Sequence, residues 1–263
     1  RRMLESPECR VEGLRIVLSL FERASGIFAI EDNKRDAITA MQLASGNEPR
    51  MEVRVLETKY PQGAERMLIY ACTGAEINAS QLPADAGCIV LNVETLHAIY
   101  EALVLGLPVT KRAVTVTGKA LKEPKNFLVR IGTSFSELPE AAGGYAKQPK
   151  KFVCGGPMRG VEMKNLEVPV TKTVTGFLCM SQDYTDKPGI CIRCGACTEA
   201  CPIYLLPTKL ADAAEAGKEQ EFRDMNGMEC LGCGSCSFVC PARRQLAPSI
   251  QDMRRKLLAQ GRR

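Results

Sequence analysis

The sequence is poor in the residues that stack nucleic-acid bases and in histidine ligands for metals. It has no tryptophan, one histidine and only 5% aromatic residues among 263 positions. Proteins that hold single-stranded nucleic acid stack its bases on aromatic side chains, so we expect no nucleic-acid partner. One histidine cannot build a metal site, and His97 is expected to be an ordinary surface or core residue of a helix.

Long hydrophobic runs are also absent. No apolar run approaches the roughly 18 residues that cross a bilayer, and the first residues lack the apolar core of a signal peptide. We therefore expect a cytoplasmic protein that is soluble or peripheral. Because the chain starts at Arg1 and not at a methionine, we also expect that its natural start lies upstream.

Positive charge is concentrated at one end of the chain. The net charge is +5, but residues 241–263 alone carry +6, so the rest of the chain carries −1. A basic segment of this kind is usually a solvated face. The alternative is a surface that docks on anionic lipid or on an acidic partner protein.

Strands and helices alternate over residues 1–110, which predicts an α/β domain of Rossmann-like type. The predicted elements are a helix after Pro7, strands at 26–30, 51–56 and 88–91, and helices ending near 44 and spanning 64–72 and 94–104. Asp32 or Asn33 is expected to cap the helix that ends near residue 44. This order predicts a parallel sheet with helices on its faces.

The pattern changes after residue 110. Stretches at 113–117 and 127–131 predict two antiparallel strands, and Ser136 predicts the start of a short helix. The lysine-rich residues 147–151 are expected to form a linker. We therefore predict four regions: an α/β domain at 1–110, a small β module at 111–146, a connecting glycine-rich segment of loop and strand at 147–187, and a cysteine-rich helical domain with a basic tail at 188–263.

Thirteen cysteines are the most unusual feature, and eight of them lie between residues 191 and 240. They form the pattern C-x2-C-x2-C-x3-C-P twice. Three close cysteines on a loop bind three irons of one 4Fe-4S cluster, while the fourth cysteine binds the other cluster. We therefore predict two crossed ligand sets: Cys191, Cys194, Cys197 and Cys240 for one cluster, and Cys230, Cys233, Cys236 and Cys201 for the other.

Two zinc sites are the structural alternative. Zinc sites usually pair two C-x2-C knuckles across a dozen or more residues, and they have no need of a third cysteine followed by Cys-Pro. The spacing therefore favours iron-sulfur clusters. The remaining cysteines are expected to be small buried hydrophobic residues, with Cys88 in a strand and Cys72 in a helix; they are Cys9, Cys72, Cys88, Cys154 and Cys179.

Residues 228–244, which hold the second motif, closely resemble the C-subunit family of Rnf electron-transport complexes. Further stretches similar to the same family are spread along the chain, at 30–34, 59–65, 92–95, 155–158 and 169–172. Residues 59–65 and 92–95 also resemble the flavin-bearing, NADH-oxidising subunit of respiratory complex I. Residues 112–144 are similar to the family's soluble-ligand-binding β-grasp module, and the C-terminal domain is then a two-cluster ferredoxin-like domain.

The resemblance implies an electron-transfer subunit on the inner face of the cell membrane, within an ion-translocating complex. Such a subunit takes a hydride from NADH onto FMN and passes single electrons through two 4Fe-4S clusters, to ferredoxin or membrane partners or in the reverse direction. It would be one subunit of an NADH:ferredoxin-type oxidoreductase.

The resemblance also assigns flavin-site residues. Tyr60, Gly63 and Glu65 match a loop that borders the flavin and the nicotinamide. Asn92 and Thr95 match positions near the FMN phosphate and ribityl chain. The family's upstream glycine-rich phosphate loop does not lie within this sequence, so we expect these 263 residues alone to bind FMN weakly.

Two other functions stay open. In the first, the α/β domain is a non-catalytic docking platform and only the cysteine-rich domain relays electrons. In the second, the chain resembles the cobalamin-reductase subunit of bacterial microcompartments, which shares the order of modules. The second motif, followed by Arg243 and Arg244, favours the Rnf family over this alternative.

Overall fold

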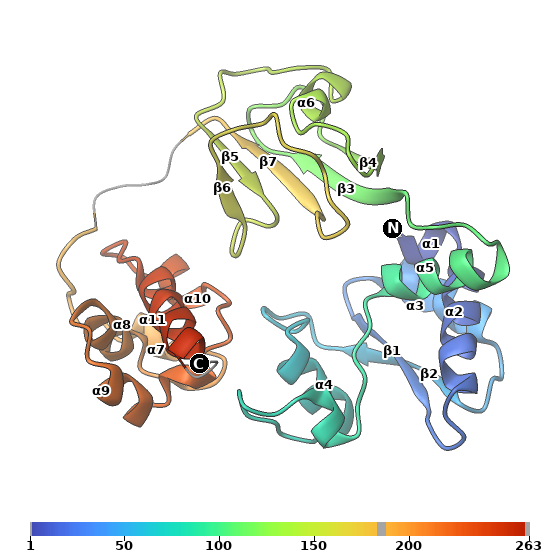
Figure 1. Ribbon diagram of the computed structural model, residues 1–263, viewed down its shortest axis with the longest axis horizontal. Coiled ribbons are helices and arrows are strands. Elements are labelled where there is room, and N and C mark those ends of the chain that lie inside the picture. The colour runs from blue at the N-terminus through green and yellow to red at the C-terminus, as the bar shows by residue number, and fades with distance from the viewer. Residues whose placement is uncertain (1, 183–187, 261–263) are drawn as a thin grey trace. The chain divides into compact units, whose positions relative to one another are not determined.

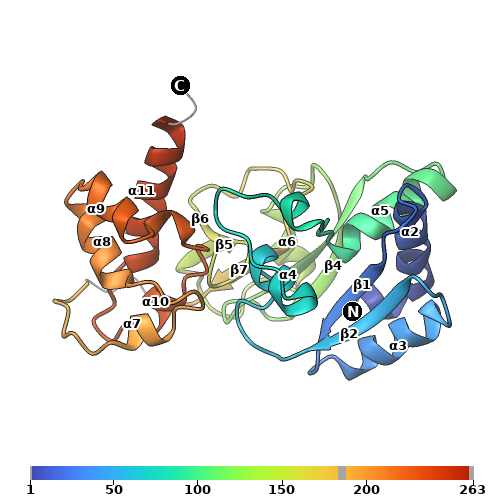
Figure 2. The same ribbon diagram turned by 90° about the horizontal axis from the view of Figure 1, so that it is seen from below.

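The computed structural model describes residues 2–182 and 188–260, and the chain divides into two compact units at residues 109 and 110 (Figures 1 and 2). The elements of the first unit are α1 (Arg2–Glu5), α2 (Pro7–Ser19), β1 (Gly26–Glu31), α3 (Arg35–Ser45), β2 (Met51–Leu56), α4 (Glu65–Thr73), a 3-10 turn at Pro83–Ala86 and α5 (Val93–Val104). These bounds agree closely with the predicted helices and strands, except at 88–91.

The β-α-β unit predicted for residues 26–56 is present. Strands β1 and β2 pair in parallel, with Gly26 opposite Met51 and Glu31 opposite Leu56, and α3 connects them. Phe28 and Ile30 lie on the same face of β1 and are buried. They pack with Val11, Leu14, Leu18 and Leu96, so helices α2 and α5 cover this face.

The predicted strand at 88–91 is wrong. These residues carry no strand, and Ile89 is 62% exposed. They line a cavity of about 510 Å³ that β1, α2 and α4 also border. The segment and β1 line the same cavity, and the sheet of the first unit consists of β1 and β2 alone in the described part of the chain.

The predicted cap of α3 is also wrong. The residue before the helix is Lys34, and it makes no side-chain cap. Asp32 instead accepts hydrogen bonds from the backbone N–H of Thr58 at 3.2 Å and from its hydroxyl at 2.5 Å. These bonds tie the loop after β1 to the loop after β2, which a sequence pattern based on helix caps cannot reveal.

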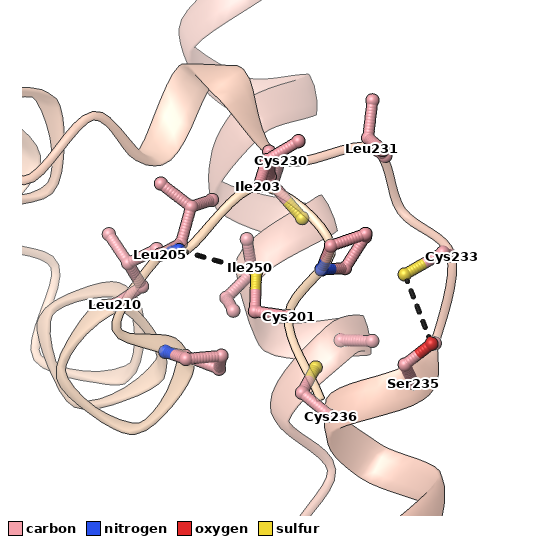
Figure 3. A pocket seen from close by; sticks show the side chains of 14 residues that line it. Cys201, Ile203, Leu205, Leu210, Cys230, Leu231, Cys233, Ser235, Cys236 and Ile250 are labelled. Carbon is pink, nitrogen blue, oxygen red and sulfur yellow. Dashed lines mark hydrogen bonds between the residues drawn. The ribbon is translucent and has the colours of Figure 1, made fainter. Parts of the chain in front are cut away.

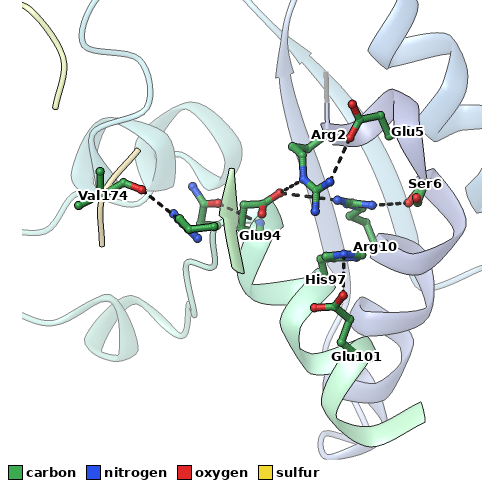
Figure 4. Close-up of polar contacts among 10 residues, drawn as sticks. Arg2, Glu5, Ser6, Arg10, Glu94, His97, Glu101 and Val174 are labelled. Carbon is green, nitrogen blue, oxygen red and sulfur yellow. Dashed lines mark hydrogen bonds and ion pairs between the residues drawn. The ribbon is translucent and has the colours of Figure 1, made fainter. Parts of the chain in front are cut away.

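A buried charge lies where α2 packs on α5 (Figure 4). The side chain of Arg10 is fully buried and donates to the carbonyl of Ser6 at 2.7 Å, and its Nη2 lies 3.6 Å from the carboxylate of Glu94. Arg2 binds the same carboxylate at 2.8 Å. The two helices come close enough for this cluster because Gly13 has no side chain: a Cβ there would lie 2.1 Å from the carbonyl oxygen of Leu96.

The second unit begins with a mixed five-stranded sheet. Its elements are β3 (Lys111–Thr117), β4 (Lys125–Arg130), α6 (Glu137–Ala141), β5 (Lys151–Cys154), β6 (Val161–Met163) and β7 (Gly176–Met180). The strand order is β4-β3-β7-β5-β6, with β3 and β4 antiparallel, as predicted, and β3 and β7 parallel.

One core holds this sheet together. Phe177 on β7 is fully buried, its ring 5.1 Å from that of Phe135 and 5.9 Å from that of Phe152. Phe152 belongs to β5, so strands on both sides of residue 146 share the same core. The predicted division at 146 therefore falls inside the sheet, and the lysine-rich stretch of 147–151 runs into β5.

The cysteine-rich region is helical. Its elements are α7 (Ala196–Glu199), α8 (Pro207–Glu215), α9 (Glu219–Asp224), a 3-10 turn at Gly227–Glu229, α10 (Ser235–Phe238) and α11 (Leu246–Gln260). Helices α8 and α9 are separate because Gly217, which follows α8, has a positive φ of 68°. Leu210 and Phe222 then pack with Ile250 and Leu257 of α11.

Candidate metal centre

The two cysteine motifs adopt the same backbone conformation. Each position in the second motif lies 39 residues after its counterpart in the first. Gly195 and Gly234 both have positive φ, at 82° and 86°, and each precedes a one-turn helix, α7 or α10. Arg193 and Gly232, a further pair of counterparts, also have positive φ. The repeat predicted from the sequence is therefore a repeat of structure.

Four cysteines from the two motifs line one cavity (Figure 3). Cys230, Cys233 and Cys236 come from the second motif, and Cys201 comes from the first. Their sulfur atoms are turned toward the same space. The backbone N–H of Leu205 donates to the sulfur of Cys201 at 3.3 Å, which fixes this side chain against the other motif. This set of four is the crossed set expected from the spacing.

The other four cysteines are less enclosed. Cys194 is exposed, whereas Cys191, Cys197 and Cys240 are half-buried. The N–H of Gly189 donates to the carbonyl of Ala242 at 2.8 Å, so the chain just before the first motif lies beside the chain just after the second. The hydroxyl of Thr208 lies 3.1 Å from the sulfur of Cys197.

The thiols around the cavity suit a cluster of several atoms. Within residues 2–182 and 188–260, no group of three or more Cys, His, Asp or Glu side chains is arranged to hold a single metal ion. The four cysteines come from two C-x2-C-x2-C-x3-C-P motifs and line one cavity, and this shared use of two motifs is typical of 4Fe-4S clusters and not of paired zinc knuckles. The donor set, four cysteines with small neighbours such as Gly234 and Ser235, fits a 4Fe-4S cluster.

Burial controls the protonation of these thiols. Burial raises the pKa of Cys236 to about 12 and also raises the pKa of Cys230. Both thiols are therefore protonated at neutral pH when no metal is bound. Because iron binds the thiolate, assembly of a cluster here is coupled to the release of protons.

The flavin-site residues assigned by resemblance all lie at the surface of the first unit. Tyr60, Gly63 and Glu65 are exposed in the loop between β2 and α4 and at the first residue of that helix. This loop follows the carboxyl end of β2, where ligands of parallel α/β sheets usually bind. The hydrogen bonds between Asp32 and Thr58 join it to the loop after β1, so Asp32, which lies in the family-like stretch 30–34 and was expected to cap a helix, belongs to this edge.

Asn92 and Thr95 lie at the start of α5. The side chain of Asn92 caps the helix by accepting a hydrogen bond from the N–H of Glu94 at 2.9 Å. Thr95 is exposed. The capping role by itself explains an asparagine at this position, and contact with a flavin stays a prediction.

The five cysteines outside the motifs were expected to be buried, and only one of them is fully buried. Cys179 on β7 is fully buried, and burial raises its pKa to about 12. The other four are half-buried; they are Cys9, Cys72, Cys88 and Cys154. Cys72 lies in a helix, as predicted, but Cys88 lies in the irregular segment that borders the cavity beside β1.

Three protein-family models match the chain in sequence order. They are the Nuo51 FMN-binding domain at residues 1–101, the SLBB domain at 113–162 and the 4Fe-4S dicluster domain at 190–243. The matches define a protein that combines a flavin-binding domain with a two-cluster domain. They confirm the prediction of iron-sulfur clusters and support FMN as a further cofactor.

Curated relatives match almost the whole chain. The C subunit of the Na⁺-translocating ferredoxin:NAD⁺ oxidoreductase complex of Acetobacterium woodii is 41% identical over 262 residues, which are 99% of this chain and 59% of that protein. The C subunit of the proton-translocating ferredoxin:NAD⁺ oxidoreductase complex of Clostridium ljungdahlii is 41% identical over 266 residues, covering 100% and 58%. The C subunit of the ion-translocating oxidoreductase complex of Rhodobacter capsulatus is 37% identical, covering 98% and 50%.

Over its length the chain is therefore similar to the C subunits of ion-translocating oxidoreductase complexes, and the resemblance expected from the sequence is confirmed. The chain spans somewhat more than half the length of the first two relatives. Within the described part of the chain, no helix has the length and apolar character needed to cross a bilayer.

Proposed function

We propose that the chain relays electrons between a nicotinamide-flavin site and ferredoxin or membrane partners, as one subunit of an Rnf-type ion-translocating complex. The observation that carries the proposal is the convergence of Cys201 with Cys230, Cys233 and Cys236 on one cavity. Cysteines from two motifs at one site are expected of a dicluster relay, in which the two clusters lie close together. When bound, each cluster supplies a one-electron couple.

The proposal assigns a role to each region. Residues 1–110 are a Rossmann-like domain for FMN and NADH, 111–146 form the first part of the β-grasp module, 147–187 add strands to its sheet and lead on to the next domain, and 188–263 are the ferredoxin-like domain. The eight motif cysteines hold the clusters in the crossed sets given above. Tyr60, Gly63 and Glu65 border the flavin and nicotinamide, and Asn92 and Thr95 lie near the FMN phosphate and ribityl chain.

A peripheral position on the inner face of the membrane is part of the proposal. The basic segment 241–263 would contact anionic lipid or acidic subunits of the complex. Its charge is partly used inside the fold, because Arg244 pairs with Asp212 and Glu215, and Lys256 pairs with Glu219 at 2.8 Å. Docking would therefore depend on the charges that remain, and high salt should release the protein from membranes.

Anaerobic reconstitution with iron, sulfide and FMN tests the function. We expect about eight irons per chain, because each cluster holds four, and bleaching of the cluster absorbance by NADH. The variant Cys88→Ser, outside both motifs, is the control and should keep its iron. Clusters that bleach with dithionite but never with NADH, even when FMN is added to saturation, would favour the docking platform, and about two metal ions per chain would favour zinc sites.

A further inference from the structure

One side chain outside the cysteine motifs reaches a sulfur of the enclosed site. Gln251 on α11 donates through Nε2 to the sulfur of Cys230 at 3.3 Å. Its amide oxygen accepts a hydrogen bond from Nη1 of Arg254 at 3.2 Å, and Nε of Arg254 donates to the carbonyl of Met228 at 3.0 Å. A chain of hydrogen bonds thus runs from the backbone before the second motif to its first cysteine.

Arg254 determines which end of the Gln251 amide faces the sulfur. A guanidinium only donates hydrogen bonds, so the group that it contacts must be the amide oxygen. The amide nitrogen is then turned toward Cys230, and its orientation follows from the hydrogen-bond network. Arg254 therefore acts as a positioning residue for Gln251.

Gly232 makes room for this contact. Its φ is +65°, and a Cβ at this position would lie 3.0 to 3.1 Å from the amide atoms of Gln251. Its own N–H also donates to the sulfur of Cys230, at 3.4 Å. Cys230 thus receives hydrogen bonds from two N–H groups, one from the backbone of Gly232 and one from Gln251 on α11. A side chain at position 232 would obstruct the hydrogen bond from Gln251.

The first repeat differs at the corresponding positions. The counterparts of Gln251 and Arg254, 39 residues earlier, are Asp212 and Glu215. Both are bound by Arg244, at 2.9 and 3.1 Å. The three side chains of the first repeat carry a net charge of −1, whereas Gln251 and Arg254 carry +1.

We propose that Gln251, positioned by Arg254, raises the reduction potential of the cluster held by Cys230 and so makes the two clusters of the relay unequal. The inference rests on the proposed function, because it requires both clusters. Reduction places additional negative charge on the cluster and its sulfurs. An N–H donor and a nearby cation stabilise that charge more in the reduced state than in the oxidised state, which raises the potential.

The test is a redox titration followed by electron paramagnetic resonance, on wild type and on two variants. Gln251→Leu removes the N–H donor. Gln251→Glu replaces the amide with a carboxylate of nearly the same shape, which has no N–H donor and adds a negative charge. We expect one of the two midpoints to fall while the other stays. The expected change is about threefold to tenfold in the equilibrium constant for reduction, or roughly 28 to 59 mV for a one-electron couple.

Gln220→Leu is the matched control. Gln220 is also a helical glutamine with a bound amide, but its partner is Asp224, on α9. Both midpoints should be unchanged in this variant. Arg254→Leu should lower the same midpoint as the Gln251 variants, because Gln251 loses the group that positions it and the site loses a cation.

The outcomes separate this inference from the proposed function. Iron and sulfide are counted in every sample before titration. A wild-type chain without two clusters contradicts the proposed function itself. Two full clusters with unchanged midpoints in both Gln251 variants overturn the role of Gln251 alone. Loss of the Cys230 cluster in both variants would also overturn it, since Gln251 would then be needed to hold the cluster and not to adjust its potential.

Discussion

Cys201 and Cys230 line the same cavity, although they belong to different copies of the cysteine motif. We therefore expect Cys201→Ser to damage the cluster held by Cys230, Cys233 and Cys236, and to leave the other cluster in place. Iron counts should fall toward half, and electron paramagnetic resonance should show which signal is lost. Cys197→Ser is the companion variant and should remove the opposite signal. If both variants remove the same signal, the crossed assignment is wrong.

The spacing of the cysteines was enough to predict this arrangement, because local backbone geometry and cluster size dictate which cysteines can share a cluster. The contact from Gln251 could not be predicted in the same way. It depends on how α11 packs over the second motif and on the missing side chain at Gly232. Neither the packing of a distant helix nor the space left by the missing Cβ of Gly232 produces a recognisable pattern in the sequence.

Prediction from the sequence meets the same limit in the α/β domain, where contacts between distant segments leave no local pattern. Hydrophobic periodicity predicted β1, β2 and the helices, because each follows from residues close in sequence. It also predicted a strand at 88–91, since an apolar run fits either a strand or an irregular segment beside a cavity. Asp32 was assigned to a helix cap for a similar reason. Its actual partner, Thr58, lies on another loop, which local rules do not consider.

His97 should make the stability of the first unit depend on pH. Its side chain is 16% exposed, and burial, followed by the positive charge of Arg10, lowers its pKa below the ordinary value of 6.5. Glu101, whose carboxylate lies 3.4 Å from Nε2, opposes this only in part. The folded state therefore favours the neutral ring. Stability is fully present above pH 6.5 and is lost as the pH falls from 6.5 toward the lowered value.

Hydrogen exchange of the α2 and α5 amides at about pH 7.5 and about pH 5.5 measures this effect. Protection should be weaker at the lower pH in the wild type, after correction for the intrinsic exchange rate. The sequence has one histidine, so His97→Gln should abolish the histidine contribution completely. An equal loss of protection in the variant would assign the pH dependence to other groups.

Gly118 should be intolerant of any side chain. It follows β3 with φ of +127°, and a Cβ would lie 2.1 Å from the carbonyl oxygen of Cys179 on β7. Gly118→Ala should therefore destabilise the sheet by about 2 kcal/mol or more, since the clash is with backbone that belongs to the neighbouring strand. Urea unfolding, with hydrogen exchange of β3 and β7 to localise the change, measures it.

Gly132 is the matched control for this substitution. It also has a positive φ, of 100°, but nothing lies within 4 Å of the position that a Cβ would occupy. Gly132→Ala should cost only the backbone strain, about 1 to 2 kcal/mol. Equal effects of the two substitutions would mean that strain alone, and not the contact with β7, makes Gly118 necessary.

Helix α11 carries part of a hydrophobic core as well as the charge of the basic tail. Ile250, Met253 and Leu257 all belong to that core, so deletion from residue 247 onward would remove core residues together with charge. The electrostatic role of the tail is better tested with Arg255→Gln, because the Arg255 side chain is 77% exposed and its partner on the same helix, Asp252, is 65% exposed, so water screens the pair. This variant should bind anionic vesicles more weakly at low salt while its unfolding curve stays unchanged. Unaltered vesicle binding would favour a solvated face at this position.

Two neighbouring leucines on α11 should differ in their importance for stability. Leu257 is 2% exposed and packs in the core of the cysteine-rich region, whereas Leu258 is 49% exposed. Leu257→Ala should lower the free energy of unfolding by about 2 to 5 kcal/mol because it leaves a cavity. Leu258→Ala should change it by less than about 1 kcal/mol, because its side chain already contacts water. Urea unfolding of the metal-free protein under reducing conditions compares the two, and equal destabilisation would contradict the placement of Leu257 in the core.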